Sequence, residues 1–182
     1  MTATQLVTVE ELLQMGSDAP YELWEGVLKE VSPSSFKTDV IALRIGSVVL
    51  THVDDNQLGF ATASSGGYML STDPATVVAP DAGFVRGDRF PNGIPARGFS
   101  PVPPDLAVEV ISPTDRKADI AEKQALYTKA RVPLVWWVDP ERRTVTVHRL
   151  GQAPETVEAT GVLDGGGVLP GFTLDLRTIF RD

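Results

Sequence analysis

The run Leu106-Ala107-Val108-Glu109-Val110-Ile111 constrains the fold most, because it is apolar at nearly every position and contains a single acid. A strand without polar alternation is typical of a sheet that is covered on both faces. An ionised carboxylate on such a strand costs several kcal/mol unless a partner compensates its charge. Glu109 therefore predicts a central strand in a covered sheet and a polar site beside that strand.

A second apolar run also contains one acid. Asp81 follows Pro80 in the stretch from Val77 to Val85, which we interpret as a strand with the acid embedded in it. Two carboxylates on adjacent strands provide oxygen ligands at a fixed separation, and these are the ligands that Mg²⁺ or Mn²⁺ prefers. Asp81 and Glu109 thus predict a metal site of the kind used for phosphodiester cleavage. The alternative for Asp81 is a structural role, capping backbone amides after the proline.

Composition narrows the class of protein. The chain has 182 residues, 42% of them hydrophobic, which fits one globular domain over residues 1–182. It has no cysteine and only two histidines, so disulfides and zinc sites are not expected. No long apolar run or signal-peptide pattern is present, so we expect a cytoplasmic protein without membrane contact. The net charge of −8 argues against broad electrostatic attraction to nucleic acid.

The pattern along the chain alternates helices and strands. We expect a capped helix from Thr8 to about Gly16, a longer helix over 39–50 and a third over 115–130. Besides the two runs above, strands are expected over 21–31 (a hairpin), 59–63, 68–70, 134–138 and 144–149, with a loop over 86–104 and a small closing element over 165–176. This order predicts an α/β fold with a mixed β-sheet flanked by helices.

A lysine for the site is expected from the third helix. Residues two apart on a strand share a face, so a lysine at position 111 would accompany Glu109, but Ile111 occupies that position. Ile120 and Tyr127 need burial and lie on one helical face, which turns Lys123 toward the sheet. An inward lysine needs an anion, and Glu109, Asp81 and Asp119 are available. A surface pair with Asp119, one turn earlier, is the alternative.

Several stretches taken together resemble the Uma-two family of restriction-endonuclease-like proteins, within the PD-(D/E)xK nuclease superfamily. They are Tyr21 to Gly26, Pro80-Asp81, Asp105 to Pro113, Asp119 to Tyr127 and Val132 to Pro140, and the resemblance covers about residues 8–176. It implies a restriction-endonuclease-like core, with the first hairpin and the C-terminal strands as added β elements. It also implies Asp81 and Glu109 as metal ligands, Lys123 as a displaced catalytic lysine and Glu22 as a further acid near the metal.

The resemblance implies a Mg²⁺- or Mn²⁺-dependent DNA endonuclease. Thr38 stands where many relatives carry a histidine, and a catalytically silent nuclease-fold module that binds nucleic acid or protein is the alternative function. Cutting both strands of a duplex addresses two phosphates, which one site per chain achieves most simply as a homodimer. We expect the dimer contact in 132–138 or 144–149, and we interpret Tyr127, Trp136 and Trp137 as core packing.

Overall fold

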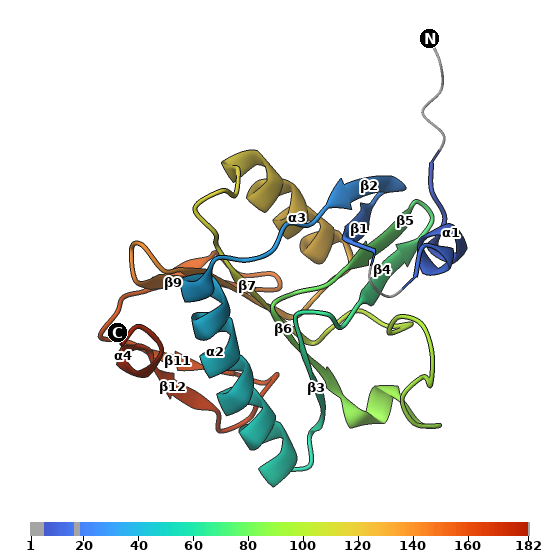
Figure 1. The fold of residues 1–182 in the computed structure, drawn as a ribbon. Helices are drawn as coiled ribbons and strands as arrows, with labels where there is room; N and C mark the ends of the chain where they lie inside the picture. Colours follow the sequence, from blue (N-terminus) through green and yellow to red (C-terminus); the bar gives the residue numbers. More distant parts are fainter. Residues whose placement is uncertain (1–5, 17–18, 182) are drawn as a thin grey trace.

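The computed structural model describes residues 6–16 and 19–181 (Figure 1). Within these residues, the largest sheet has six strands in the order β10-β9-β8-β7-β6-β3. The strands are β3 (Gly59–Ala63), β6 (Ala82–Arg86), β7 (Leu106–Val110), β8 (Leu134–Asp139), β9 (Thr144–Arg149) and β10 (Glu155–Val157). β7 and β8 are parallel and the other pairs are antiparallel, so the sheet is mixed, as predicted.

Two helices cover the two faces of this sheet. Helix α2 (Phe36–Asp55) packs on one face, where its apolar side chains share a core with Leu106, Val108 and Val110 of β7. Helix α3 (Lys117–Lys129) packs on the other face, where Tyr127 shares a core with Ala107. Because side chains alternate along a strand, Glu109 lies on the same face as Ala107 and points toward α3.

A second sheet of four strands adjoins the first. Its order is β2-β1-β5-β4, with β1 (Tyr21–Trp24), β2 (Val27–Glu30), β4 (Tyr68–Thr72) and β5 (Ala75–Val78). The predicted hairpin turns at Glu25 and Gly26, which both have positive φ. Helix α1 (Val9–Gln14) packs on this sheet and begins with the predicted capping box between Thr8 and Glu11.

The expectation of one continuous strand from Val77 to Val85 is wrong. β5 ends at Val78 in the four-stranded sheet, and β6 begins at Ala82 in the six-stranded sheet. Pro80 lies in the break and has no N–H to donate to a ladder, which favours an interruption there. Asp81 is therefore placed where the chain passes from one sheet to the other, immediately before β6.

The two stretches expected to supply a dimer contact lie inside the six-stranded sheet, and that contact stays a prediction. β8 lies between β7 and β9, and β9 lies between β8 and β10, so a contact there would have to use side chains and not a free strand edge. Most side chains of β8 are buried, including Trp136 at 0% exposure. The sequence pattern alone does not reveal that these strands are interior.

The remaining elements close the molecule. Helix α2 extends beyond the expected range of 39–50 at both ends, and it begins at Phe36 because Ser35 caps its N-terminus through the amide of Thr38. The segment after β6 is a loop with a short 3-10 turn, η1 (Gly87–Arg89), as the glycines and prolines predicted. A hairpin of β11 (Val162–Asp164) and β12 (Thr173–Asp175), followed by α4 (Leu176–Ile179), covers the α2 side of the core. No helix in residues 6–16 and 19–181 is long and apolar enough to cross a membrane.

Candidate active site

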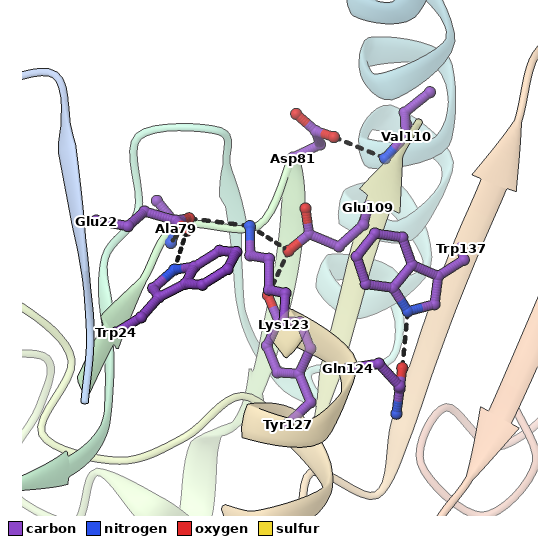
Figure 2. Close-up of polar contacts among 10 residues, drawn as sticks. All are labelled: Glu22, Trp24, Ala79, Asp81, Glu109, Val110, Lys123, Gln124, Tyr127 and Trp137. Carbon is purple, nitrogen blue, oxygen red and sulfur yellow. Dashed lines mark hydrogen bonds and ion pairs between the residues drawn. The ribbon is translucent and has the colours of Figure 1, made fainter. Parts of the chain in front are cut away.

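Lys123 joins two carboxylates from different elements. Its Nζ lies 2.7 Å from Oε1 of Glu109 on β7 and 2.9 Å from Oε1 of Glu22 on β1 (Figure 2). The side chains of Lys123, Glu109 and Glu22 are 12%, 9% and 6% exposed, so the three charges are largely shielded from water. The helix pattern thus placed the lysine correctly. The alternative surface pair is wrong, because Asp119 contacts Arg116 instead.

Glu22 holds Lys123 in place through a carboxylate whose two oxygens are both used. Oε1 accepts a hydrogen bond from the amide of Ala79 at 2.8 Å as well as from Lys123. Oε2 accepts from Nε1 of Trp24 at 2.7 Å, two residues further along the same face of β1. The three hydrogen bonds from Lys123, Ala79 and Trp24 occupy both oxygens of the Glu22 carboxylate. Glu22 therefore orients the ammonium of Lys123 and has little capacity left to bind a metal.

Tyr127 is a member of the site that sequence reasoning treated as packing alone. Its hydroxyl donates to Oε1 of Glu109, the same oxygen that contacts Lys123. Tyr127 follows Lys123 by four residues, so the two side chains lie on one face of α3. The spacing of four residues between Lys123 and Tyr127 is the feature of the sequence that could have indicated a role for the tyrosine hydroxyl in the site. Among the described residues, none donates a hydrogen bond to Oε2 of Glu109.

Asp81 lies beside Glu109 across the β6–β7 ladder. The last paired residues are Ala82 and Val108, so one step further brings Asp81 opposite Glu109. Oδ2 of Asp81 accepts a hydrogen bond from the amide of Val110 at 2.7 Å (Figure 2). The predicted capping role is therefore real for one oxygen. The second oxygen, Oδ1, receives no hydrogen bond from the part of the chain that the structure describes.

Burial and mutual repulsion shift the proton affinities of the cluster. The pKa of Glu109 is raised to about 7, mainly by burial and also by the negative charges of Asp81 and Glu22, while the ammonium of Lys123 opposes the rise. Burial also raises the pKa of Asp81, against the opposing effects of the Val110 amide and Lys123. For Lys123, burial lowers the pKa, but Glu109 and Glu22 outweigh it and hold the pKa above its usual value. The lysine consequently stays protonated at neutral pH.

The donor set fits a divalent cation. Three carboxylates face one ammonium, so the cluster carries two net negative charges when all groups are ionised. Oδ1 of Asp81 and Oε2 of Glu109 are hard oxygen donors that no described residue occupies. Within the described ranges no group of three or more acidic, histidine or cysteine side chains is arranged to hold a metal. Two carboxylates are nevertheless enough for Mg²⁺, which usually keeps several waters.

A cleft of about 1540 Å³ borders the cluster. Glu22 and Asp81 line it, whereas Glu109 and Lys123 are not among its lining residues, in agreement with their low exposure. The loop over 90–100 and the exposed side of α2 form other parts of its wall. Its charged lining residues in the described chain are Glu22, Asp39, Asp54, Asp81 and Arg97. The cleft is therefore mainly apolar and acidic.

Comparisons with known proteins agree with this fold. The model of a family described as "Putative restriction endonuclease" matches residues 9–177. A crystal structure of a "putative nuclease belonging to DUF820" from Anabaena variabilis superposes with a TM-score of 0.80. The match has 20% sequence identity and covers 96% of this chain and 97% of that chain, which shows a shared fold. No curated protein matches significantly. Because the family model spans nearly the whole sequence, the chain belongs to the Uma2 family of restriction-endonuclease-like proteins.

Proposed function

We propose that the protein is a Mg²⁺-dependent endonuclease that hydrolyses phosphodiester bonds in DNA. One observation supports this most: a protonated lysine is fixed between two buried carboxylates, beside a third carboxylate that has a free oxygen. Membership of a family described as "Putative restriction endonuclease" supports the same reaction and makes DNA the expected substrate. Mn²⁺ fits the same oxygen donors.

Each side chain of the site has a different role in the proposed reaction. Asp81 and Glu109 would hold the metal through their free oxygens, Oδ1 and Oε2. When bound, the metal supplies charge stabilisation for the phosphate and a water of lowered pKa. Lys123 contributes a fixed positive charge that stabilises the negative charge developing on the phosphate or orients the attacking water. Glu22 and Tyr127 act as positioning residues, Glu22 for the ammonium and Tyr127 for the carboxylate of Glu109.

Lys123 takes the place of a lysine on the strand. Ile111 follows Glu109 by two positions and is partly buried in the apolar core under α3. Lys123 instead reaches Oε1 of Glu109 from α3, and Oε1 of Glu22 accepts a hydrogen bond that replaces part of the hydration that the ammonium loses on burial. The site is thus assembled from β1, β7, α3 and the residue immediately before β6, and its positive charge is held on a helix.

A silent binding module is the second candidate, and the acidic cleft favours it. Only Arg97 opposes four acids among the charged residues that line the cleft. Such a lining attracts DNA phosphates poorly without a bound cation. Thr38, at the position of the family histidine, is buried, and its hydroxyl contacts that of Ser35 in the helix cap. Thr38 therefore has a structural role in the first turn of α2.

Cleavage of supercoiled plasmid separates the two candidates. We expect nicking in Mg²⁺ or Mn²⁺ that stops on addition of EDTA and is lost in the Asp81→Asn and Glu109→Gln variants. The matched control is Asp119→Asn, because Asp119 is an acid of α3 that pairs with Arg116 at the surface. Metal-dependent nicking that persists in both site variants would exclude this site. Absence of nicking in the folded wild-type protein would favour the silent module, and the absence of DNA binding as well would favour a protein as its partner. For cutting both strands, we further propose a two-fold homodimer.

A further inference from the structure

Arg97 differs in charge from the other ionised residues that line the cleft. Of the lining residues that the structure describes, it is the only base, and its side chain is exposed. None of the carboxylates in the described chain forms an ion pair with Arg97, although four acids line the same cleft. Its planar set of N–H donors is therefore available for an anion from outside the protein.

The two other arginines of residues 86–104 have acidic partners within the protein. Nε of Arg86 lies 3.4 Å from Oδ1 of Asp88, and Nη1 of Arg89 lies 3.2 Å from Oδ2 of Asp105. Asp105 immediately precedes β7, so its pair with Arg89 ties the loop to the six-stranded sheet. Arg97 makes no such tie in the described chain, so its charge is not used to hold the loop.

The loop that carries Arg97 is fixed against β4. The amide of Ser100 donates to the carbonyl of Gly67 at 2.8 Å, and the amide of Met69 donates to the carbonyl of Ser100 at 2.9 Å. A Cβ atom at Gly67 would overlap the ring of Phe99, so the loop packs closely on the residue before β4. These contacts begin two residues after Arg97 and limit the positions that its guanidinium can reach.

The strand pairing places this loop beside the residues that lead to Asp81. Tyr68 of β4 pairs with Val78 of β5 on one side and forms a bridge with Ser100 on the other. Neighbouring strands lie about 4.8 Å apart, so Ser100 is roughly 10 Å from Val78. Val78 precedes Asp81 by three residues, and Arg97 precedes Ser100 by three. Arg97 and Asp81 both line the cleft, and this pairing brings them close enough for one nucleic-acid strand to reach both.

The turn between β3 and β4 adds uncharged donors to the same wall. Ser64 and Ser65 line the cleft and are exposed, and their turn contacts the loop that carries Arg97. Arginine and serine side chains are common donors to phosphate oxygens. The part of the wall that α2 forms presents the acids Asp39 and Asp54 instead. An anion in the cleft is therefore favoured beside the loop and the turn, and not beside α2.

We propose that Arg97 binds a backbone phosphate of DNA, on the strand whose scissile phosphate lies at Asp81. The inference rests on the proposed function, because it takes DNA as the substrate. A guanidinium binds a phosphate through two parallel N–H donors, which fixes the position of the strand as well as attracting it. Together with a cation at Asp81, Arg97 offsets the acids of the cleft. A phosphate contact carries no base information, so its contribution to affinity does not depend on the DNA sequence.

The salt dependence of DNA binding tests this role of Arg97. Binding of a short fluorescent DNA duplex is measured by anisotropy in Ca²⁺ at several NaCl concentrations, for the wild-type protein and for R97Q, R97K and R131Q. Each phosphate contact contributes about 0.9 to the slope of log affinity against log salt concentration. R97Q should lose about that much of the slope and bind roughly tenfold more weakly, equally on two unrelated sequences. R97K should keep the slope, because it keeps the charge.

R131Q is the matched control. Arg131 is also exposed, and none of the described carboxylates forms an ion pair with it. It lies before the start of β8, whereas Asp81 lies beside the end of the parallel strand β7. R131Q should therefore bind DNA like the wild-type protein. Equal slopes for the wild-type protein, R97Q and R131Q would overturn the phosphate site, and so would a wild-type protein that does not bind DNA in Ca²⁺.

Two further measurements separate this inference from its alternatives. Urea unfolding of R97Q should match that of the wild-type protein, and a loss of stability as large as the loss of affinity would overturn the site by showing a structural role. Plasmid nicking separates the site from the proposed function. Loss of the slope in R97Q, in a protein that does not nick DNA, would contradict only the proposed catalysis. Nicking by the wild-type protein, with an unchanged slope in R97Q, would contradict only the phosphate site.

Discussion

Replacing Lys123 by methionine should destabilise the protein strongly above neutral pH. The substitution keeps much of the aliphatic volume of the side chain and removes the ammonium that contacts both Glu109 and Glu22. These two carboxylates are 7% and 5% exposed as residues, so water cannot replace the lost cation well. Their remaining donors are Tyr127 for Glu109 and Trp24 and Ala79 for Glu22.

The expected cost follows from burial. Removing one partner of a buried ion pair typically costs about 3–5 kcal/mol, because the other charge is left uncompensated. Lys129 and Glu25 form a pair of nearly the same length, 2.6 Å, but their side chains are 61% and 49% exposed. An exposed pair contributes at most about 1 kcal/mol. The Lys129→Met variant is therefore the matched control, with the same helix, the same substitution and a similar distance.

Urea unfolding followed by circular dichroism measures both effects. We expect the loss in Lys123→Met to be larger at about pH 8 than at about pH 5.5, because Glu109 takes up a proton at the lower pH. A Lys123→Met, Glu109→Gln double variant should recover much of the loss at the higher pH. Equal and small losses in the Lys123 and Lys129 variants would refute the reasoning, since burial would then contribute nothing to the coupling.

Two further substitutions probe Glu109 and its neighbour. The folded protein binds the proton of Glu109 more tightly than the unfolded chain, so the stability of the wild-type protein falls as pH rises from about 4.5 to about 7. The Glu109→Gln variant should therefore gain stability relative to wild type across that window. Unfolding curves at several pH values measure the difference, and parallel pH profiles of the two proteins would contradict the raised pKa. Tyr127→Phe should cost about 1–2 kcal/mol by removing a buried hydrogen bond to a carboxylate, with the fold unchanged by circular dichroism.

The elements nearest the site were predictable because their signals are local. The apolar run around Glu109 specifies a strand covered on both faces, and the positions of Ile120 and Tyr127 turn one side of α3 inward with Lys123. Burial of an ammonium then requires a nearby anion, which identified Glu109 as a partner of Lys123 but did not identify Glu22, the second carboxylate that it contacts. These arguments need only the regular repeat of side-chain directions along a helix and along a strand.

Long-range arrangement was not predictable in the same way. The break at Pro80 separates two sheets, and nothing in the residues from Val77 to Val85 states which strand pairs with which. For the same reason the sequence does not show that the strand within 132–138 has neighbours on both edges, so that a dimer contact there, which stays a prediction, would have to use side chains. The hydrogen bond from Tyr127 to Glu109 depends on the register between α3 and β7, which only the folded chain fixes.

Asp81 offers the sharpest distinction between a metal ligand and a structural cap. As a cap, it accepts a hydrogen bond from the amide of Val110, and an asparagine oxygen can accept the same bond. As a ligand, it contributes charge toward a cation at the edge of an acidic cleft. Asp81→Asn therefore keeps the cap and weakens the ligand, so DNA binding measured with and without a divalent cation separates the two roles.

We expect opposite effects of Asp81→Asn in the two conditions. In EDTA, DNA affinity measured by fluorescence anisotropy should rise, because one negative charge leaves the cleft. In Ca²⁺, which takes oxygen ligands like Mg²⁺, the affinity should fall relative to wild type, because the cation that offsets the remaining acids is held less well. Asp39→Asn is the control, since Asp39 lines the cleft from α2 and should raise affinity in both conditions. An Asp81 variant that behaves like the Asp39 variant would show that Asp81 contributes only charge and capping, and would leave Glu109 without a second ligand.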